Sequence, residues 1–199
     1  MTSQAEFFDS YADKWDSLER DDICELLDRV VRESGIEPGM DILDVGTGTG
    51  VIIPCLLQST NNNCNIRAID ISKEMLRVAA SKVSSDKVSF ELADIEDFDC
   101  ADASFDAVIC NAVYPHFSDK AHVLKRAWSL LRPEGIIVIS HPTGRDAVNQ
   151  VHSETDSVVS EDRAPCIDEM KRMLSAAGFS DISATDEPEF YLAHARKRQ

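Results

Sequence analysis

Residues 42–50 read Ile-Leu-Asp-Val-Gly-Thr-Gly-Thr-Gly, a short apolar strand that runs directly into a glycine-rich turn. The run from Val51 to Gln58 that follows is compatible with a helix. Glycines permit backbone angles that other residues avoid, and without a β-carbon they let a ligand lie against the main chain. A helix at this point would add free N–H groups and the positive end of its dipole. Asp44 would lie near the carboxyl end of the strand, where open α/β sheets bind their ligands.

Two further strand-like runs narrow the choice of ligand. Residues 65–70 end in Asp70, 20 residues after Gly50. This is the spacing expected of a carboxylate that accepts hydrogen bonds from ribose hydroxyls. Residues 88–93 form a third apolar run, which is followed by Asp94. We therefore expect Asp44, Asp70 and Asp94 to lie along one edge of one sheet.

These motifs resemble those of the class I S-adenosylmethionine-dependent methyltransferases, in particular the small-molecule, ubiquinone-biosynthesis-like branch (type 11). The turn of that family reads Glu/Asp-x-Gly-x-Gly-x-Gly. Residues 105–111 are similar to its Phe-Asp-x-Val strand, and residues 131–135 to its Leu-Lys/Arg-Pro-Gly-Gly turn, with Glu134 in place of a glycine. The resemblance covers roughly residues 5–197. The turn residues that match are Asp44, Gly46, Gly48 and Gly50.

The resemblance implies a doubly wound, Rossmann-like α/β fold. Its mostly parallel sheet has seven strands in the order 3-2-1-4-5-7-6, with the last strand antiparallel. It also implies S-adenosylmethionine as the cofactor and S-adenosylhomocysteine as the product. Asp70 would accept the ribose hydroxyls, and the adenine would pack between Ile71 and Ile95. The expected cofactor-binding residues are Tyr11, Asp44, Gly46, Gly48, Gly50, Asp70, Ile71, Met75, Asp94, Ile95 and Asn111.

Length and composition favour one domain over residues 1–199, with an apolar content of 43%. No apolar run approaches the roughly 20 residues of a membrane span. Residues 1–22 contain no apolar leader block, so we expect a cytoplasmic protein. The net charge of −16 opposes binding to nucleic acid or to an anionic membrane. We expect a small molecule as the partner, and no remaining apolar stripe indicates an oligomer.

Aromatic residues mark the N-terminal segment. Phe7, Tyr11 and Trp15 recur at intervals of four, which predicts a helix over residues 5–17 with one aromatic face. One interpretation is a helix that packs on the domain through this face. The resemblance implies instead that residues 1–22 form a lid over the cofactor, with a tyrosine near its methionine moiety. Such a lid should be mobile without ligand.

Residues that contact the methyl acceptor should follow the fourth and fifth strands. Methyl transfer is an in-line displacement at a sulfonium, and it needs a base only when the nucleophile carries a proton of high pKa. Asn111 would contact the cofactor, and His116 is either a base or a hydrogen-bonded loop residue. The Asn-x-x-Tyr pattern at 111–114 is similar to the Asn-Pro-Pro-Tyr motif of DNA methyltransferases. Both prolines are missing, and the net charge is wrong for DNA.

Residues 141–165 form the second such segment, expected to be a substrate-side insertion after the fifth strand. Pro142 suits the first turn of a helix. Within that helix, Val148, Val151, Thr155 and Val158 would form an inward stripe. Arg145, Asn149, His152 and Asp156 would form a polar stripe that either lines the acceptor pocket or faces solvent. In the first case Arg145 would hold an anionic substrate group, with His152 or His141 near the methyl acceptor. The catalytic candidates are His116, His141, Arg145, Asn149 and His152.

Several alternatives remain open at this stage. A nicotinamide-dependent oxidoreductase shares the first two glycines of the turn, but Val51 occupies the position where its fingerprint has glycine or alanine. A cofactor-binding sensor without turnover is a second alternative. His116, His141 and His152 could converge on a metal, although no short ligand motif is present, and we expect none. Six cysteines show no paired spacing and are expected to be reduced, with Cys110 the best candidate for a reactive thiol.

Overall fold

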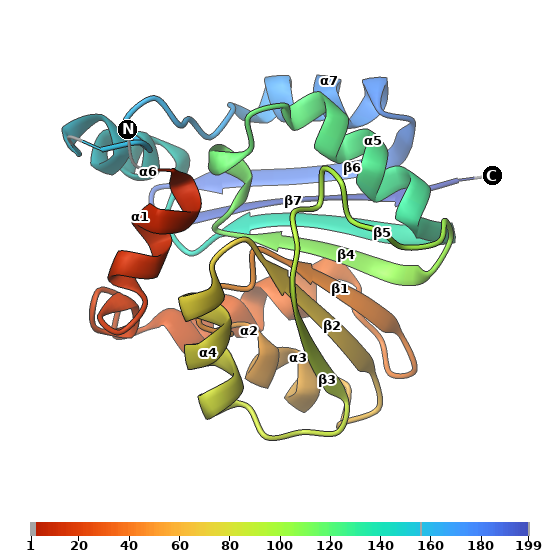
Figure 1. Ribbon diagram of the computed structural model, residues 1–199. Helices are drawn as coiled ribbons and strands as arrows, with labels where there is room; N and C mark the ends of the chain where they lie inside the picture. The colour runs from red at the N-terminus through yellow and green to blue at the C-terminus, as the bar shows by residue number, and fades with distance from the viewer. Residues whose placement is uncertain (1–2, 156, 199) are drawn as a thin grey trace.

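The computed structural model describes residues 3–155 and 157–198, which form a sheet with helices on both faces (Figure 1). The strand order is β3-β2-β1-β4-β5-β7-β6, as predicted. Strands β1 to β5 are parallel, whereas β7 is antiparallel to both β5 and β6. The strands are β1 Asp41–Val45, β2 Asn65–Asp70, β3 Val88–Leu92, β4 Phe105–Asn111, β5 Leu131–His141, β6 Phe179–Glu187 and β7 Phe190–Lys197.

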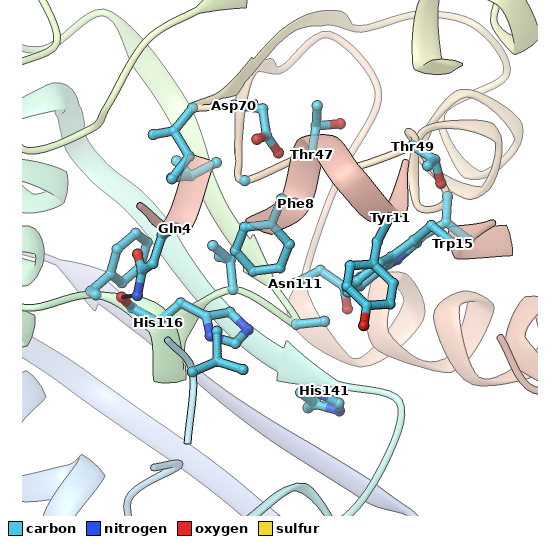
Figure 2. A pocket seen from close by; sticks show the side chains of 18 of the residues that line it. Gln4, Phe8, Tyr11, Trp15, Thr47, Thr49, Asp70, Asn111, His116 and His141 are labelled. Carbon is cyan, nitrogen blue, oxygen red and sulfur yellow. Dashed lines mark hydrogen bonds between the residues drawn. The ribbon is translucent and has the colours of Figure 1, made fainter. Parts of the chain in front are cut away.

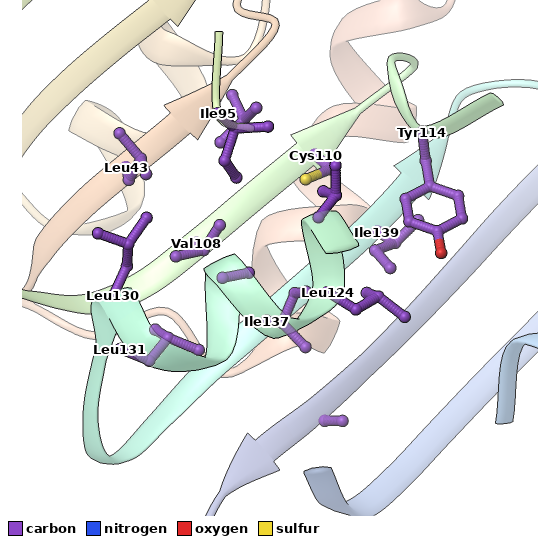
Figure 3. Packing of buried hydrophobic residues seen from close by; sticks show 14 of the residues in the cluster. Leu43, Ile95, Val108, Cys110, Tyr114, Leu124, Leu130, Leu131, Ile137 and Ile139 are labelled. Carbon is purple, nitrogen blue, oxygen red and sulfur yellow. The ribbon is translucent and has the colours of Figure 1, made fainter. Parts of the chain in front are cut away.

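Side chains of the central strands alternate between two apolar layers. Leu43, Val108 and Ile137 are paired across β1, β4 and β5, and they pack on one face of the sheet (Figure 3). Their neighbours Ile42 and Ile136 pack on the other face. Because both faces are covered, these strands are continuous apolar runs. Helices α5 Lys120–Leu130 and α7 Ile167–Ala176 cover the first face, and α2 Ile23–Ser34 and α3 Ile53–Ser59 cover the second.

Local capping signals explain several of the helix boundaries. Gly35 ends α2 with φ of +79°, a left-handed angle that suits glycine. The Ser72 hydroxyl begins α4 (Lys73–Lys82) by accepting a hydrogen bond from the Met75 N–H at 3.1 Å. For α5 the cap is Asp119, whose carboxylate accepts a hydrogen bond from the His122 N–H at 2.9 Å, although the adjacent Ser118 is also of a residue type preferred at this position. The Ser118 hydroxyl donates to Glu96 instead, at 3.1 Å.

The N-terminal segment is not the single helix predicted for residues 5–17. Helix α1 covers Gln4–Tyr11, and after a turn a short 3-10 helix, η1, covers Trp15–Ser17. The interruption lets two carboxylates reach separate partners. Asp9 accepts a hydrogen bond from the Ser72 hydroxyl and Asp16 accepts one from the Thr49 hydroxyl, each at 2.6 Å. Met1 and Thr2 of the predicted lid lie outside the described residues.

Helix α6 (Arg145–Glu154) follows β5, and residues 157–166 then lead to α7 without further helix. The inward stripe predicted for this segment is only partly correct. Val148 is buried, whereas the side chains of Val151 and Val158 are 60% and 41% exposed. Asp156 lies outside the described residues. Within the ranges 3–155 and 157–198, no helix has the length and apolar character to cross a membrane.

Candidate active site

A cavity of about 480 Å³ lies at the carboxyl ends of the parallel strands. Four of its lining residues are the last residues of four strands, and α1 and α6 supply further parts of the wall. Figure 2 shows side chains of α1 and of the strand ends around this space. The fold therefore forms its cavity at the edge where the sequence predicts ligand binding. The four strand-terminal residues are Val45, Asp70, Asn111 and His141.

The glycine turn brings main chain to the cavity wall. Gly46 has φ of +63°, and a β-carbon there would lie 2.3 Å from the Val113 Cγ2 atom, so only glycine fits. Gly46 and Thr47 line the cavity. Gly48 and Gly50 are outside the lining, and the Gly48 N–H donates to Asp70 Oδ2 at 2.8 Å. The helix after the turn begins at Ile53, two residues later than predicted.

Asp44 lies beneath the turn and outside the cavity lining. Its Oδ2 atom accepts a hydrogen bond from the Thr47 hydroxyl at 2.6 Å. Its Oδ1 atom is buried and has no partner among the described residues. Burial raises the pKa of Asp44 to about 7. In this structure the carboxylate therefore holds the turn.

Asp70 is the acidic group that reaches the cavity from β2. The Ser72 N–H donates to its Oδ1 and the Gly48 N–H to its Oδ2, both at 2.8 Å. Burial raises the pKa of Asp70, and these N–H donors act in the opposite direction. The carboxylate is thus oriented by two turns that are far apart in the sequence. The predicted neighbours Ile71, Asp94 and Ile95 also line the cavity, whereas Met75 is buried outside the lining.

Asn111 and the residue after it form the wall at the end of β4. The Ser140 hydroxyl donates to Asn111 Oδ1 at 2.9 Å, which fixes the amide. Ala112 has φ of +56°, and its backbone turns the chain along the cavity. Cys110, one residue earlier, is fully buried, and burial raises the pKa of its thiol. The hypothesis of a reactive thiol at this position is therefore wrong.

Aromatic side chains of the N-terminal segment close the outer side of the cavity. The Phe7 and Tyr11 ring centroids are 4.9 Å apart, and those of Phe8 and Trp15 are 5.8 Å apart. All four residues line the cavity. The segment is held on α4 and on the glycine turn by Asp9 and Asp16, and Asp16 also forms an ion pair with Lys82.

Three histidines and one carboxylate meet on the opposite wall. The His116 Nδ1 atom lies 2.7 Å from Asp162 Oδ2, and the His116 and His152 ring centroids are 5.0 Å apart. The His152 Nδ1–H donates to the Asp162 carbonyl at 3.0 Å. Gln4 and Phe8 of α1 lie beside His116 in Figure 2, and the Gln4 amide donates to the His116 carbonyl at 2.9 Å.

His141 differs from the other two histidines in its surroundings. Its Nδ1 atom is buried and has no hydrogen-bond partner among the described residues. Burial, followed by the neighbouring His116 and His152, lowers the pKa of His141 to about 3. Burial also lowers the pKa of His152. No group of three or more metal-ligating side chains is found within the described parts of the chain.

The polar stripe predicted on α6 does not lie together on the cavity wall. Arg145 is outside the lining and forms ion pairs with Asp146 and Asp186. The Asn149 amide bonds both backbone groups of Ala164, accepting at 2.8 Å and donating at 3.2 Å. Asn149 therefore holds the following segment, and of this stripe only His152 lines the cavity among the described residues.

Three residues at the site have no local signal in the sequence. Gln4 and Glu19 line the cavity from the N-terminal segment, and Asp162 contacts His116 across 46 positions of the chain. Each lies in a polar stretch whose composition is that of an ordinary surface loop or helix end. Only the folded arrangement identifies their partners.

Comparison with known proteins adds independent findings. A family model described as a methyltransferase domain matches residues 36–178. An O-methyltransferase of Penicillium expansum is 31% identical over 186 residues, which cover 86% of this chain and 65% of that protein. A ubiquinone/menaquinone biosynthesis C-methyltransferase of Geotalea daltonii is 31% identical over 143 residues, which cover 67% of this chain and 60% of that protein. The chain thus spans less than two thirds of the length of these curated relatives.

A solved structure with a similar fold is the S-adenosylmethionine-dependent methyltransferase of Aquifex aeolicus. It matches with a TM-score of 0.75 and 21% sequence identity. The match covers 94% of this chain and 98% of that one, so the likeness of fold extends over nearly the whole molecule.

Proposed function

Because the chain belongs to the class I S-adenosylmethionine-dependent methyltransferases, we propose that it transfers a methyl group to a small-molecule acceptor. S-adenosylmethionine would supply that group as an electrophilic sulfonium. The observation that carries the proposal is the Asp70 carboxylate, which reaches the cavity wall and is oriented by the glycine turn and by the start of α4. Carboxylates at this position accept hydrogen bonds from ribose hydroxyls.

The residues around Asp70 fit the remaining parts of the cofactor. Ile71 and Ile95 provide apolar surface for the adenine, and Asp94 provides an acceptor at its edge. The bare main chain at Gly46 allows close approach of the amino-acid end. Backbone groups at Asn111 would hold that end from the other side. Asp44 keeps the turn in place from below, because its Oδ2 atom accepts a hydrogen bond from the Thr47 hydroxyl.

The N-terminal segment would exclude water from the reacting groups and open to exchange ligands. Tyr11 lines the cavity and is 40% exposed, so it lies at the rim. Several contacts of the segment with the body are polar pairs, such as Asp9 with Ser72, beside the ring contact of Phe8 with His116. Segments held in this way open at a lower free energy than the core does. We infer that residues 1–22 act as the lid.

Calorimetric titration with S-adenosylhomocysteine, run beside NAD and NADP, tests the proposal. We expect micromolar affinity for the first ligand alone. Asp70→Ala should weaken it about 100-fold, whereas the exposed Asp86→Ala should leave it unchanged, and thermal melting would show that both variants fold. Binding of a dinucleotide would favour the oxidoreductase, and binding of no ligand would refute the proposed cofactor. Cofactor binding without transfer to any acceptor would favour the sensor.

A further inference from the structure

The acceptor side of the cavity carries little positive charge. Among the described residues that line it, Arg20 is the one arginine or lysine, and it is paired with Asp22 at 2.8 Å and Glu189 at 3.1 Å. Arg145, predicted to hold an anionic group, lies outside. The cavity as a whole is lined by four carboxylates, Glu19, Asp70, Asp94 and Glu96, of which Asp70 and Asp94 belong to the cofactor side. An anionic acceptor would therefore meet carboxylates and no free cation among the described lining residues.

Apolar side chains form part of the surface around the histidines. Phe8 lies edge-on to His116, with ring centroids 5.2 Å apart. Val148 of α6 and Val159 of the segment after α6 are buried, and both line the cavity. Such a wall favours the body of an apolar molecule. The acceptor should therefore be largely apolar, with its polar group directed to the histidines.

The contact between His116 and Asp162 sets the direction of the imidazole. An ionised carboxylate only accepts hydrogen bonds, so the His116 Nδ1 carries the proton and donates it to Asp162. The Nε2 atom then carries the free lone pair of the ring. It has no hydrogen-bond partner among the described residues, and His116 lines the cavity. Asp162 would also stabilise the imidazolium that forms when Nε2 accepts a proton. Among the described residues His141 and His152 have no carboxylate partner of this kind, and burial opposes their protonation.

A positioned base is needed by one class of nucleophile in particular. A hydroxyl must lose its proton as it attacks, whereas a neutral amine or a thiolate attacks with a lone pair that is already available. We propose that the acceptor is an uncharged hydroxyl compound with an apolar body, that His116 takes the hydroxyl proton, and that Asp162 is its positioning residue. This proposal rests on the proposed methyl transfer.

Atoms and charges are conserved in the proposed methyl transfer. The hydroxyl oxygen forms a bond to the methyl carbon while the carbon–sulfur bond of the donor breaks and its electron pair stays on sulfur. The hydroxyl proton passes to Nε2 of His116. The products are a neutral methyl ether, a neutral thioether and an imidazolium paired with the Asp162 carboxylate. The proton then leaves to solvent when the cavity opens.

Nitrogen NMR of the histidine rings tests the positioning role without any ligand. The spectra are recorded at about pH 9, well above the ordinary histidine pKa, so that the rings are neutral. In the wild type we expect His116 to carry its proton on Nδ1. Asp162→Asn should move the proton to Nε2, because the asparagine amide can donate to Nδ1. Glu161→Gln, which makes the same charge change at the exposed neighbour, should leave the tautomer unchanged. A wild-type ring protonated on Nε2 would refute the proposal.

Three probes with one apolar body test the acceptor class: 2-naphthol, 2-naphthoate and 2-naphthylamine. Each is titrated into the protein loaded with S-adenosylhomocysteine, and transfer of radiolabelled methyl to each is measured. We expect 2-naphthol to bind and react at least tenfold better than the other two.

Asp162→Asn should lower the rate of methyl transfer to 2-naphthol at least tenfold while the affinity for S-adenosylhomocysteine stays unchanged. Equal or better use of the anion or the amine, or no binding of 2-naphthol, would overturn the acceptor class. Absence of S-adenosylhomocysteine binding would refute the proposed function instead.

Discussion

The two sides of the cavity are built in different ways. The cofactor side is formed by short turns at the ends of β1, β2 and β4, and its geometry is set by main chain, as at Gly46. The acceptor side is formed by side chains from α1, α6 and residues 157–162, which meet only after folding. Contacts such as Gln4 with His116 join residues 112 positions apart. The geometry of the first side is set largely by main chain, whereas the second depends on side-chain contacts between distant segments.

This difference predicts that the two sides of the cavity tolerate substitutions to different extents. The turn beneath the cofactor has little freedom, because a side chain at Gly46 would enter the space of Val113. The acceptor wall consists of side chains from α1, from α6 and the residues after it, and from the ends of two strands, where His116 follows β4 and His141 ends β5. Such segments tolerate exchange of residues, and they carry specificity in many folds. We expect substitutions on the two sides to differ accordingly in their effects.

The largest effect is expected on the cofactor side, from Gly46→Ala. The new methyl group would meet Val113 at 2.3 Å, and the backbone has φ of +63°. Overpacking and left-handed strain together should lower the free energy of unfolding by about 3 kcal/mol.

Gly48→Ala is the matched control, because φ is +55° there but no atom lies within 4 Å of the new β-carbon. It should lower the free energy by about 1 kcal/mol. Urea denaturation measures both, and equal losses would contradict the packing argument.

An intermediate effect is expected where the lid is attached. Asp9→Ala removes the acceptor for the Ser72 hydroxyl and the Glu74 N–H, at 2.6 and 3.1 Å. The segment should open more often, so trypsin should cleave after Lys14 several times faster, and the affinity for S-adenosylhomocysteine should fall about fivefold. Asp13→Ala is the control on the same segment, because its ion pair with Arg77 is exposed on both sides, with the Asp13 side chain 81% exposed, and should contribute little. Equal cleavage of the two variants would show that Asp9 does not hold the lid.

The smallest effect is expected from Arg145→Ala. The guanidinium is paired with Asp146 and Asp186 outside the cavity lining. Surface ion pairs contribute little, so the free energy of unfolding should change by about 0.5 kcal/mol or less. Transfer of methyl to 2-naphthol should stay at the wild-type rate. If the variant folds but no longer transfers methyl, Arg145 belongs to the acceptor site. The expected difference between the two sides of the cavity would then be contradicted.

Predictions from the sequence are more accurate for the cofactor side of the cavity than for the acceptor side. The strand order agrees with the one that the family resemblance implies. The bounds of β2 and β4 agree with prediction because short apolar runs bounded by turn residues are local signals. The helix predicted for residues 5–17 fails at its middle, where Asp9 and Asp16 contact different parts of the body. Periodicity describes which face of a helix is apolar, but it carries no information on where a polar partner lies. The misplaced stripe on α6 has the same origin.

The amino-acid sequence by itself identified individual strands and the glycine turn beneath the predicted cofactor site, because each depends on residues within one or two turns of chain. Its motifs implied the strand order through the family resemblance. Tertiary structure alone decided that Asp162 would orient His116, that Gln4 and Phe8 would close over it, and that Arg145 would stay outside. These arrangements depend on distances between segments, and a distance between segments is set by the packing of the whole molecule.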